Sequence, residues 1–256
     1  MTQISENIPS DFPLSTYQGG YGNLLWQPSE SLDIDSDWTM QFGIYTTPAK
    51  PGRVGGMRIR RASSGDTVTY FLQFGKNHAN GRQKIAATIK TSPATESDPL
   101  ISRAEYEFDA YAVYKDDFSQ PIECTKVKKS CSYKLGSDGR TKIEFSGQSN
   151  SIDIDGPATL SWLLFETIAR LAGPKQSPID FTLIDHFDQI KPQGRIAWRS
   201  TATVAFGGKE TELSAYDQIG RGVLPAVWWI APNRWPLAYV AGIESYLLEP
   251  ATTGEM

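Results

Sequence analysis

The chain has 256 residues, a formal net charge of -4 and a sequence pI near 5.3. Hydrophobic residues make up 39% of it and charged residues 21%, which is typical of a soluble globular protein and excludes a disordered chain. The acidic balance opposes binding to phosphate backbones, so we expect no nucleic-acid partner. The longest apolar runs are far shorter than the roughly 20 residues that a membrane-spanning helix needs, so no membrane span is expected.

Residues 1–15 lack the basic start and apolar centre of a secretory signal. This predicts a cytoplasmic protein if the N-terminus is native, and an exported protein if Met1 replaces a removed signal peptide. Cys124 and Cys131 have six residues between them. We expect either two free thiols or a disulfide across a small hairpin, and a disulfide would favour an exported protein.

The first part of the chain predicts a lead-in followed by strands. Residues 1–37 are rich in Pro, Gly, Ser and Asp and predict an irregular lead-in to a single β-rich domain over 38–256. From Trp38 apolar and polar residues alternate, as in a half-buried strand, and further alternating segments follow between turn signals. Residues 92–99 are the most loop-like and mark a candidate internal boundary. The basic clusters at 58–61 and 126–129 are expected at solvated strand edges.

One amphipathic helix is predicted at about 157–172. Asp155 is its candidate cap, Pro157 lies in the first turn, and Gly173 with the proline after it ends the pattern. Leucine and isoleucine recur at helical spacing on one side, which leaves Glu166 and Arg170 on the other side. We expect this helix to cover the sheet.

The rest of the chain predicts more strands. Residues 179–190 indicate a strand that runs into a turn of helix, 194–220 form a long hairpin, and 225–248 form another hairpin around Pro232 and Asn233. The predicted fold is therefore mostly β, an antiparallel sheet-rich sandwich or curved half-barrel with one principal helix packed on it. Over roughly the last 100 residues, the order of elements resembles the curved half-barrels of small exported lipid-carrier and uncharacterised bacterial proteins.

Motifs for several reactions are absent. The chain has no G-x-S-x-G turn for a serine nucleophile and no phosphate-cradling loop. Residues 33–37 begin like a calcium loop, but Trp38 occupies the position of the required glycine. With only His78 and His186, a three-histidine metal site is excluded, so we predict no metal and no cofactor.

Candidate site residues gather near position 220. Tyr216, His186 or His78 is the candidate general base, and Arg221, flanked by glycines, is the candidate partner for a substrate carboxylate. Further polar and aromatic side chains complete a candidate ligand site. These predicted ligand-binding residues are Trp198, Asp217, Gln218, Trp228, Trp229 and Trp235.

These residues support three hypotheses. The leading one is a carbohydrate-directed protein, with polysaccharide lyase chemistry on an acidic sugar as the favoured reaction, because aromatic rings stack on sugars. The alternative is a non-catalytic, lipocalin-like carrier of an apolar small molecule. The third is a structural or partner-binding module, which would show an exposed apolar patch and no pocket. The oligomeric state is not predicted.

Overall fold

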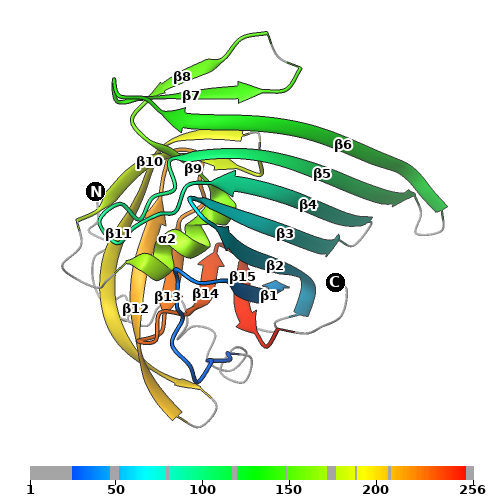
Figure 1. The fold of residues 1–256 in the computed structure, drawn as a ribbon. Coiled ribbons are helices and arrows are strands. Elements are labelled where there is room, and N and C mark those ends of the chain that lie inside the picture. The colour runs from blue at the N-terminus through cyan, green and yellow to red at the C-terminus, as the bar shows by residue number, and fades with distance from the viewer. Residues whose placement is uncertain are drawn as a thin grey trace, which may run out of the picture.

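A single, strongly curved β-sheet makes up most of the described chain and wraps around a short helix (Figure 1). This architecture confirms the predicted mostly β, antiparallel half-barrel with one helix packed on it. No helix within the described ranges is long and apolar enough to cross a bilayer. The computed structural model describes residues 25–46, 52–78, 81–116, 120–147, 149–171, 177–187, 189–206 and 209–251.

The first half of the chain forms strands that follow one another across the sheet, each antiparallel to the strand before it. They are β1 (Trp38–Thr46), β2 (Gly52–Ser64), β3 (Thr67–His78), β4 (Gly81–Thr91), β5 (Arg103–Asp116), β6 (Gln120–Leu135), β7 (Arg140–Phe145) and β8 (Ile152–Asp155). Residues 92–99 form the loop between the adjacent strands β4 and β5.

The second half of the chain supplies the helical segment and the other side of the sheet. Its elements are β9 (Ala158–Leu160), the 3-10 turn η2 (Ser161–Leu163), the helix α2 (Leu164–Arg170), β10 (Ile179–Asp185), β11 (Gln189–Phe206), β12 (Lys209–Ile219), β13 (Ala226–Ile230), β14 (Pro236–Ala241) and β15 (Glu244–Glu249). Only β9 and β10 run parallel among the described strand pairs.

The two halves of the sheet meet in its middle. β1 pairs with β2 on one side and with β15 on the other, so that Phe42 lies opposite both Met57 and Leu248. The sheet edges, β8 and β9, are consecutive in the chain. Gly156 between them donates its N–H to the carbonyl of Gly139 at 2.9 Å. β1 and β15 therefore lie in the middle of the sheet. The short segment that contains Gly156 connects the two edge strands, β8 and β9.

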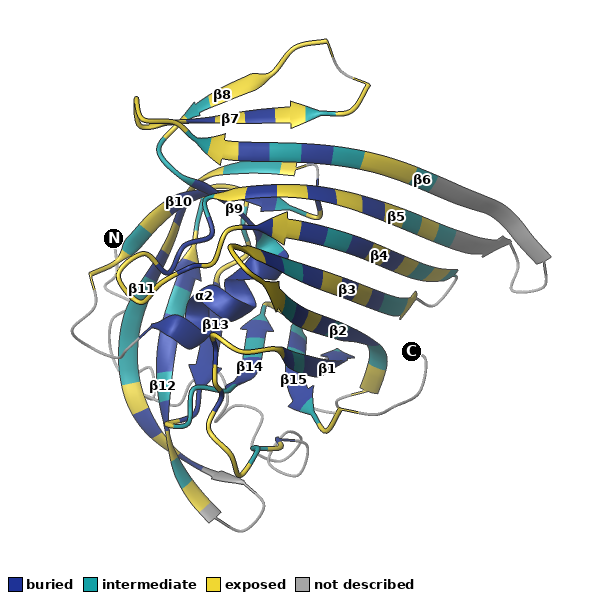
Figure 2. Cartoon of the chain, in the orientation of Figure 1, coloured by how far each residue is buried: buried dark blue, intermediate teal, exposed yellow. Residues whose placement is uncertain are grey.

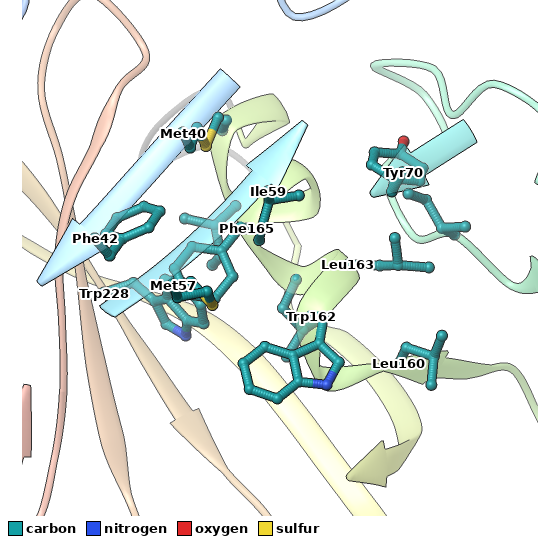
Figure 3. Close-up of a cluster of buried hydrophobic side chains, with 14 of the residues drawn as sticks. Met40, Phe42, Met57, Ile59, Tyr70, Leu160, Trp162, Leu163, Phe165 and Trp228 are labelled. Carbon is teal, nitrogen blue, oxygen red and sulfur yellow. The ribbon is translucent and has the colours of Figure 1, made fainter. Parts of the chain in front are cut away.

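The core lies on the concave face of the sheet, under the helix (Figure 2). Met40, Phe42 and Ile44 lie on this face and are fully buried, as the alternation from Trp38 onward predicted. However, Gln41 and Tyr45 on the other face are buried too, so β1 is not a half-buried strand. Phe165 of α2 packs against Phe42 with the ring centroids 4.7 Å apart. Figure 3 shows the helical side chains among those of the strands that face them.

The helix is shorter than the predicted 157–172. The chain after Pro157 first forms β9, which pairs with β10 and places Ala158 opposite Thr182. The Thr182 N–H also donates to the Pro157 carbonyl at 2.8 Å. Strand pairing thus replaces the predicted first helical turns, because tertiary contacts override helix propensity. The predicted stop at Gly173 lies outside the described residues.

A buried carboxylate anchors α2 to the sheet. Glu166 accepts hydrogen bonds from the Tyr70 hydroxyl at 2.5 Å and from Arg170 at 2.7 and 2.9 Å. Arg61 forms an ion pair with the same carboxylate at 3.3 Å. All four side chains are buried. Burial and the nearby carboxylate raise the pKa of Tyr70 far above its usual value, so the phenol stays a hydrogen-bond donor.

Two sequence-based predictions are wrong at this cluster. Glu166 and Arg170 were expected on the outward side of the helix, but both are only 1% exposed, because the curved sheet surrounds α2. Arg61 was expected at a solvated edge with the other residues of 58–61. However, β2 lies inside the sheet between β1 and β3, and Arg61 points to the concave face.

The lead-in also binds this cluster. Arg61 donates to the carbonyls of Asp35 and Ser36 at 2.7 and 2.6 Å, and Arg170 pairs with the Asp35 carboxylate at 2.8 Å. Residues 25–37 contain no regular strand or helix, as predicted for the lead-in. The cluster therefore joins the lead-in, the sheet and the helix.

Of the two alternatives for the cysteines, the structure excludes the hairpin disulfide. Cys124 and Cys131 lie on the same strand, β6, opposite Val113 and Tyr106 of β5. A strand rises about 3.3 Å per residue. The seven steps from Cys124 to Cys131 therefore place their Cα atoms about 23 Å apart. A disulfide tolerates at most about 7 Å. Cys131 is a buried free thiol, and burial raises its pKa to about 11.

The predicted turn of helix after β10 is instead a tight hairpin turn. His186 and Phe187 have φ values of 48° and 72°, both in the left-handed region. Phe187 is fully buried, its ring stacks on Phe108 at 4.8 Å, and its carbonyl accepts a hydrogen bond from the Tyr106 hydroxyl at 2.5 Å. These contacts offset the cost of the left-handed backbone.

We expect Glu166→Gln to lower the free energy of unfolding by about 3–5 kcal/mol, because it leaves the buried Arg61 without a carboxylate and Arg170 with Asp35 alone. Urea unfolding followed by circular dichroism measures this change. Glu96→Gln is the matched control, since Glu96 pairs with Arg234 at an exposed site and its loss should cost at most about 1 kcal/mol. Equal effects of the two substitutions would contradict the anchoring role of Glu166.

We also expect both thiols to be free. Protein unfolded in guanidinium chloride without a reductant should react with Ellman's reagent at both of its 2 cysteines. In folded Cys124→Ser protein at neutral pH, Cys131 should react far more slowly than after unfolding, because it is buried and protonated. A missing thiol in the unfolded protein would contradict the separation along β6.

Candidate functional site

A cavity of about 540 Å³ lies between the helical segment and the concave face of the sheet. Its walls come from β3, β4, η2, α2, β10, β11, β12, β13, β14 and β15, and from the loop between β12 and β13. These elements are distant in sequence, so the cavity exists only in the folded sheet. Its lining divides into an aromatic wall, a set of charged pairs and a mouth with exposed apolar side chains.

The aromatic wall joins the helix to the sheet. Phe165 meets Trp228 edge-on with the ring centroids 4.8 Å apart, and Trp228 contacts Tyr239 at 4.3 Å. Trp162 of η2 contacts Phe74 of β3 at 5.4 Å. Figure 3 shows Trp162 and Phe165 on the helical segment, with Trp228 beside Phe165. This wall is an apolar surface of interlocked rings.

The charged pairs lie on two other parts of the lining. Lys76 of β3 pairs with Glu244 of β15. Asp185 accepts hydrogen bonds from Lys191 at 2.5 Å and from Nδ1 of His186 at 3.0 Å. Burial of Asp185 opposes ionisation, but the interactions with His186 and Lys191 outweigh it and hold the pKa of this carboxyl well below its usual range.

Leu224 and Ile243 line the same cavity and are each 67% exposed. Leu224 lies on the β12–β13 loop and Ile243 on the β14–β15 turn. These two segments are close together, because Leu224 lies beside Gly242. These exposed apolar side chains mark the solvent-facing side of the cavity.

Three of the predicted site residues line this cavity. They are His186, Gln218 and Trp228. The Trp228 indole N–H donates to the Gln218 side-chain oxygen at 2.8 Å, so the two predicted ligand-binding residues are joined directly. His186 is half exposed on its turn and contacts the Trp162 ring at 5.9 Å.

The other predicted catalytic residues do not join them. Tyr216 is 1% exposed and Arg221 is exposed on a turn, and neither lines the cavity. The Arg221 N–H donates to the Pro192 carbonyl at 3.2 Å. His78 ends β3, and its side chain lies outside the described residues.

The remaining predicted ligand-binding residues also lie elsewhere. Trp229 is fully buried on the opposite face from Trp228, beside Ala215 and Ala238. Three others are partly buried outside the cavity lining. They are Trp198, which lies opposite Tyr216, Asp217, which pairs with Arg199 at 3.5 Å, and Trp235, whose indole donates to the Glu30 carbonyl at 2.9 Å.

The tyrosines and the paired lysines of the site were not predicted from the sequence. Tyr239 and Tyr246 face the cavity from β14 and β15, where register places Tyr239 opposite both Trp228 and Tyr246. The turn at Pro232 indicates that β13 and β14 pair, but the register shifts beside Ile230, so the turn alone did not indicate this pairing. Lys76 meets Glu244 across a long sequence separation, for which the sequence carries no local signal.

No group of three or more His, Cys, Asp or Glu side chains that could hold a metal ion occurs in the part of the chain that the structure describes. The polar groups of the cavity are ion pairs, hydroxyls and amides, which suit hydrogen bonding to an organic molecule.

The fold and the cavity together define a curved, barrel-like β protein with a helix inside the curve and an aromatic cavity beside it. The chain is similar to the crystal structure of a beta-barrel-like protein of a domain of unknown function, DUF1849, from Brucella abortus. The TM-score is 0.53 at 12% sequence identity, over 84% of this chain and 95% of that one. This likeness supports the barrel-like fold alone.

No protein family and no curated protein sequence matches the chain. The function must therefore be argued from the side chains of the cavity.

Asp185→Asn is expected to destabilise the protein at neutral pH, because the native state holds the Asp185 pKa below its value of about 4 in the unfolded chain. A depressed native pKa stabilises the fold above the unfolded pKa, and this contribution is lost as the pH falls toward the native pKa. Urea midpoints of both proteins should therefore converge as the pH is lowered below about 4. A constant difference across that range would refute the coupling.

Proposed function

We propose that this chain is a non-catalytic binding protein that encloses one small amphipathic molecule in the cavity beside α2. The observation that carries the proposal is the aromatic wall of Trp162, Phe165 and Trp228 around a volume of about 540 Å³. Pockets of about 300–1,000 Å³ with mainly apolar linings are the usual sites for small organic ligands.

The arrangement of the polar groups supports an amphipathic ligand over a purely apolar one. Lys76, Glu244, Asp185 and Lys191 lie on the lining outside the aromatic wall, where they can contact a polar group of the ligand. The exposed side chain of Leu224 at the mouth extends the apolar surface outward. A molecule with an apolar body and a polar group would contact both surfaces.

The carbohydrate and lyase hypothesis has less support. Trp228 is 2% exposed, and its ring is covered by Phe165 and Tyr239, so it offers no open face on which a sugar could stack. A lyase also needs a base and a cation that neutralises the substrate carboxylate. The predicted pair, Tyr216 and Arg221, is absent from the cavity lining.

Binding is expected to depend on the free volume of the cavity. Val223→Trp enlarges a side chain of the lining loop, and it should weaken binding of the neutral apolar dye N-phenyl-1-naphthylamine at least about tenfold, which is 1.4 kcal/mol. The dye's fluorescence increase on titration gives the dissociation constant.

Ile152→Trp on the exposed edge strand β8 is the matched control and should leave the affinity unchanged. Absence of dye binding by the unaltered protein would refute the proposed function. Equal affinities of the two tryptophan variants would place the dye outside this cavity.

A further inference from the structure

Unpartnered hydrogen-bond donors face the cavity from several sides. Gln218 is 3% exposed, and its side-chain oxygen already accepts the Trp228 indole N–H. That bond fixes the orientation of the amide, so the group left for a ligand is the NH₂, which donates. No described residue accepts a hydrogen bond from it.

The helical segment adds two more unpartnered groups. The Ser161 hydroxyl and the Trp162 indole N–H both belong to cavity-lining residues, and both are buried without a hydrogen-bond partner among the described residues. A buried donor without an acceptor costs free energy. An acceptor brought by a ligand would recover this cost.

Two tyrosine hydroxyls complete the set. Tyr239 and Tyr246 pack edge to face, with the ring centroids 5.5 Å apart, and both line the cavity. Neither hydroxyl has a hydrogen-bond partner within the described ranges. Burial raises the pKa of both phenols far above the usual value, and the carboxylates of Asp185 and Glu244 raise them further, so both remain neutral donors at physiological pH.

The charged side chains of the cavity are already paired with one another. Lys76 is paired with Glu244, and Lys191 and His186 both bind Asp185. An anionic ligand would therefore have to share each lysine with the carboxylate that already binds it. It would also approach two carboxylates, which repel it.

We propose that the ligand's polar group is an uncharged hydrogen-bond acceptor, an ester or amide carbonyl, held by Gln218, Tyr239 and Tyr246 with its acyl chain along the aromatic wall. This inference rests on the proposed function and names the chemical class of its ligand. It separates neutral acyl esters and amides from free fatty acids, which are anions at neutral pH.

The test compares ligands that share one acyl chain. Laurate, methyl laurate and lauramide are titrated against protein loaded with N-phenyl-1-naphthylamine at neutral pH, below the concentrations at which they aggregate. Displacement by the ester and the amide should occur at concentrations at least about tenfold lower than displacement by laurate. Equal or stronger displacement by laurate would overturn the inference.

Removing the hydroxyls tests the site itself. The double variant Tyr239→Phe, Tyr246→Phe keeps both rings but removes both donors, so its affinity for lauramide should fall about tenfold more than its affinity for the dye. Tyr111→Phe, at an exposed tyrosine of β5 outside the cavity, is the control and should change neither. An unchanged lauramide affinity in the double variant would overturn the inference.

The outcomes distinguish this inference from the proposed function. Failure of the unaltered protein to bind the dye would refute the proposed function. Binding of the dye without preference for the neutral acyl ligands would refute only the inferred ligand class.

Discussion

The carboxylate of Glu166 is the interaction on which the architecture depends. A helix of seven residues is not stable on its own, so α2 needs contacts with the sheet. Glu166 supplies them by binding Tyr70 and Arg61 on two strands and Arg170 on its own helix. Because the same helical segment carries the aromatic wall, the position of this buried carboxylate also sets the shape of the cavity.

Polar groups on the concave face divide into two kinds. Around Glu166, hydrogen bonds and ion pairs join the helix, the sheet and the lead-in, so these groups hold the fold together. Around the cavity, Gln218, Ser161 and the two tyrosines keep donors without described acceptors. The donors that line the cavity are therefore open to an acceptor brought by a ligand.

Local patterns in the sequence predicted the strands and most turns, because alternation and turn residues act over a few positions. They failed where distant partners decide the outcome. Glu166 was placed on the wrong side of the helix because its partner Arg61 lies far away in the sequence. For the site, Gln218 and Trp228 were found within one local cluster, whereas Lys76 and Glu244 meet only through the pairing of the two halves of the sheet.

The pairing of β1 with β15 has a consequence for how the chain folds. Strands β1 to β8 need only neighbours in sequence, but one edge of β1 has no partner until β15 has been synthesised. Such long-range pairing slows folding, and an open strand edge attracts other chains meanwhile. During synthesis the nascent protein is therefore most exposed to aggregation along β1, until β15 docks and completes the cavity wall.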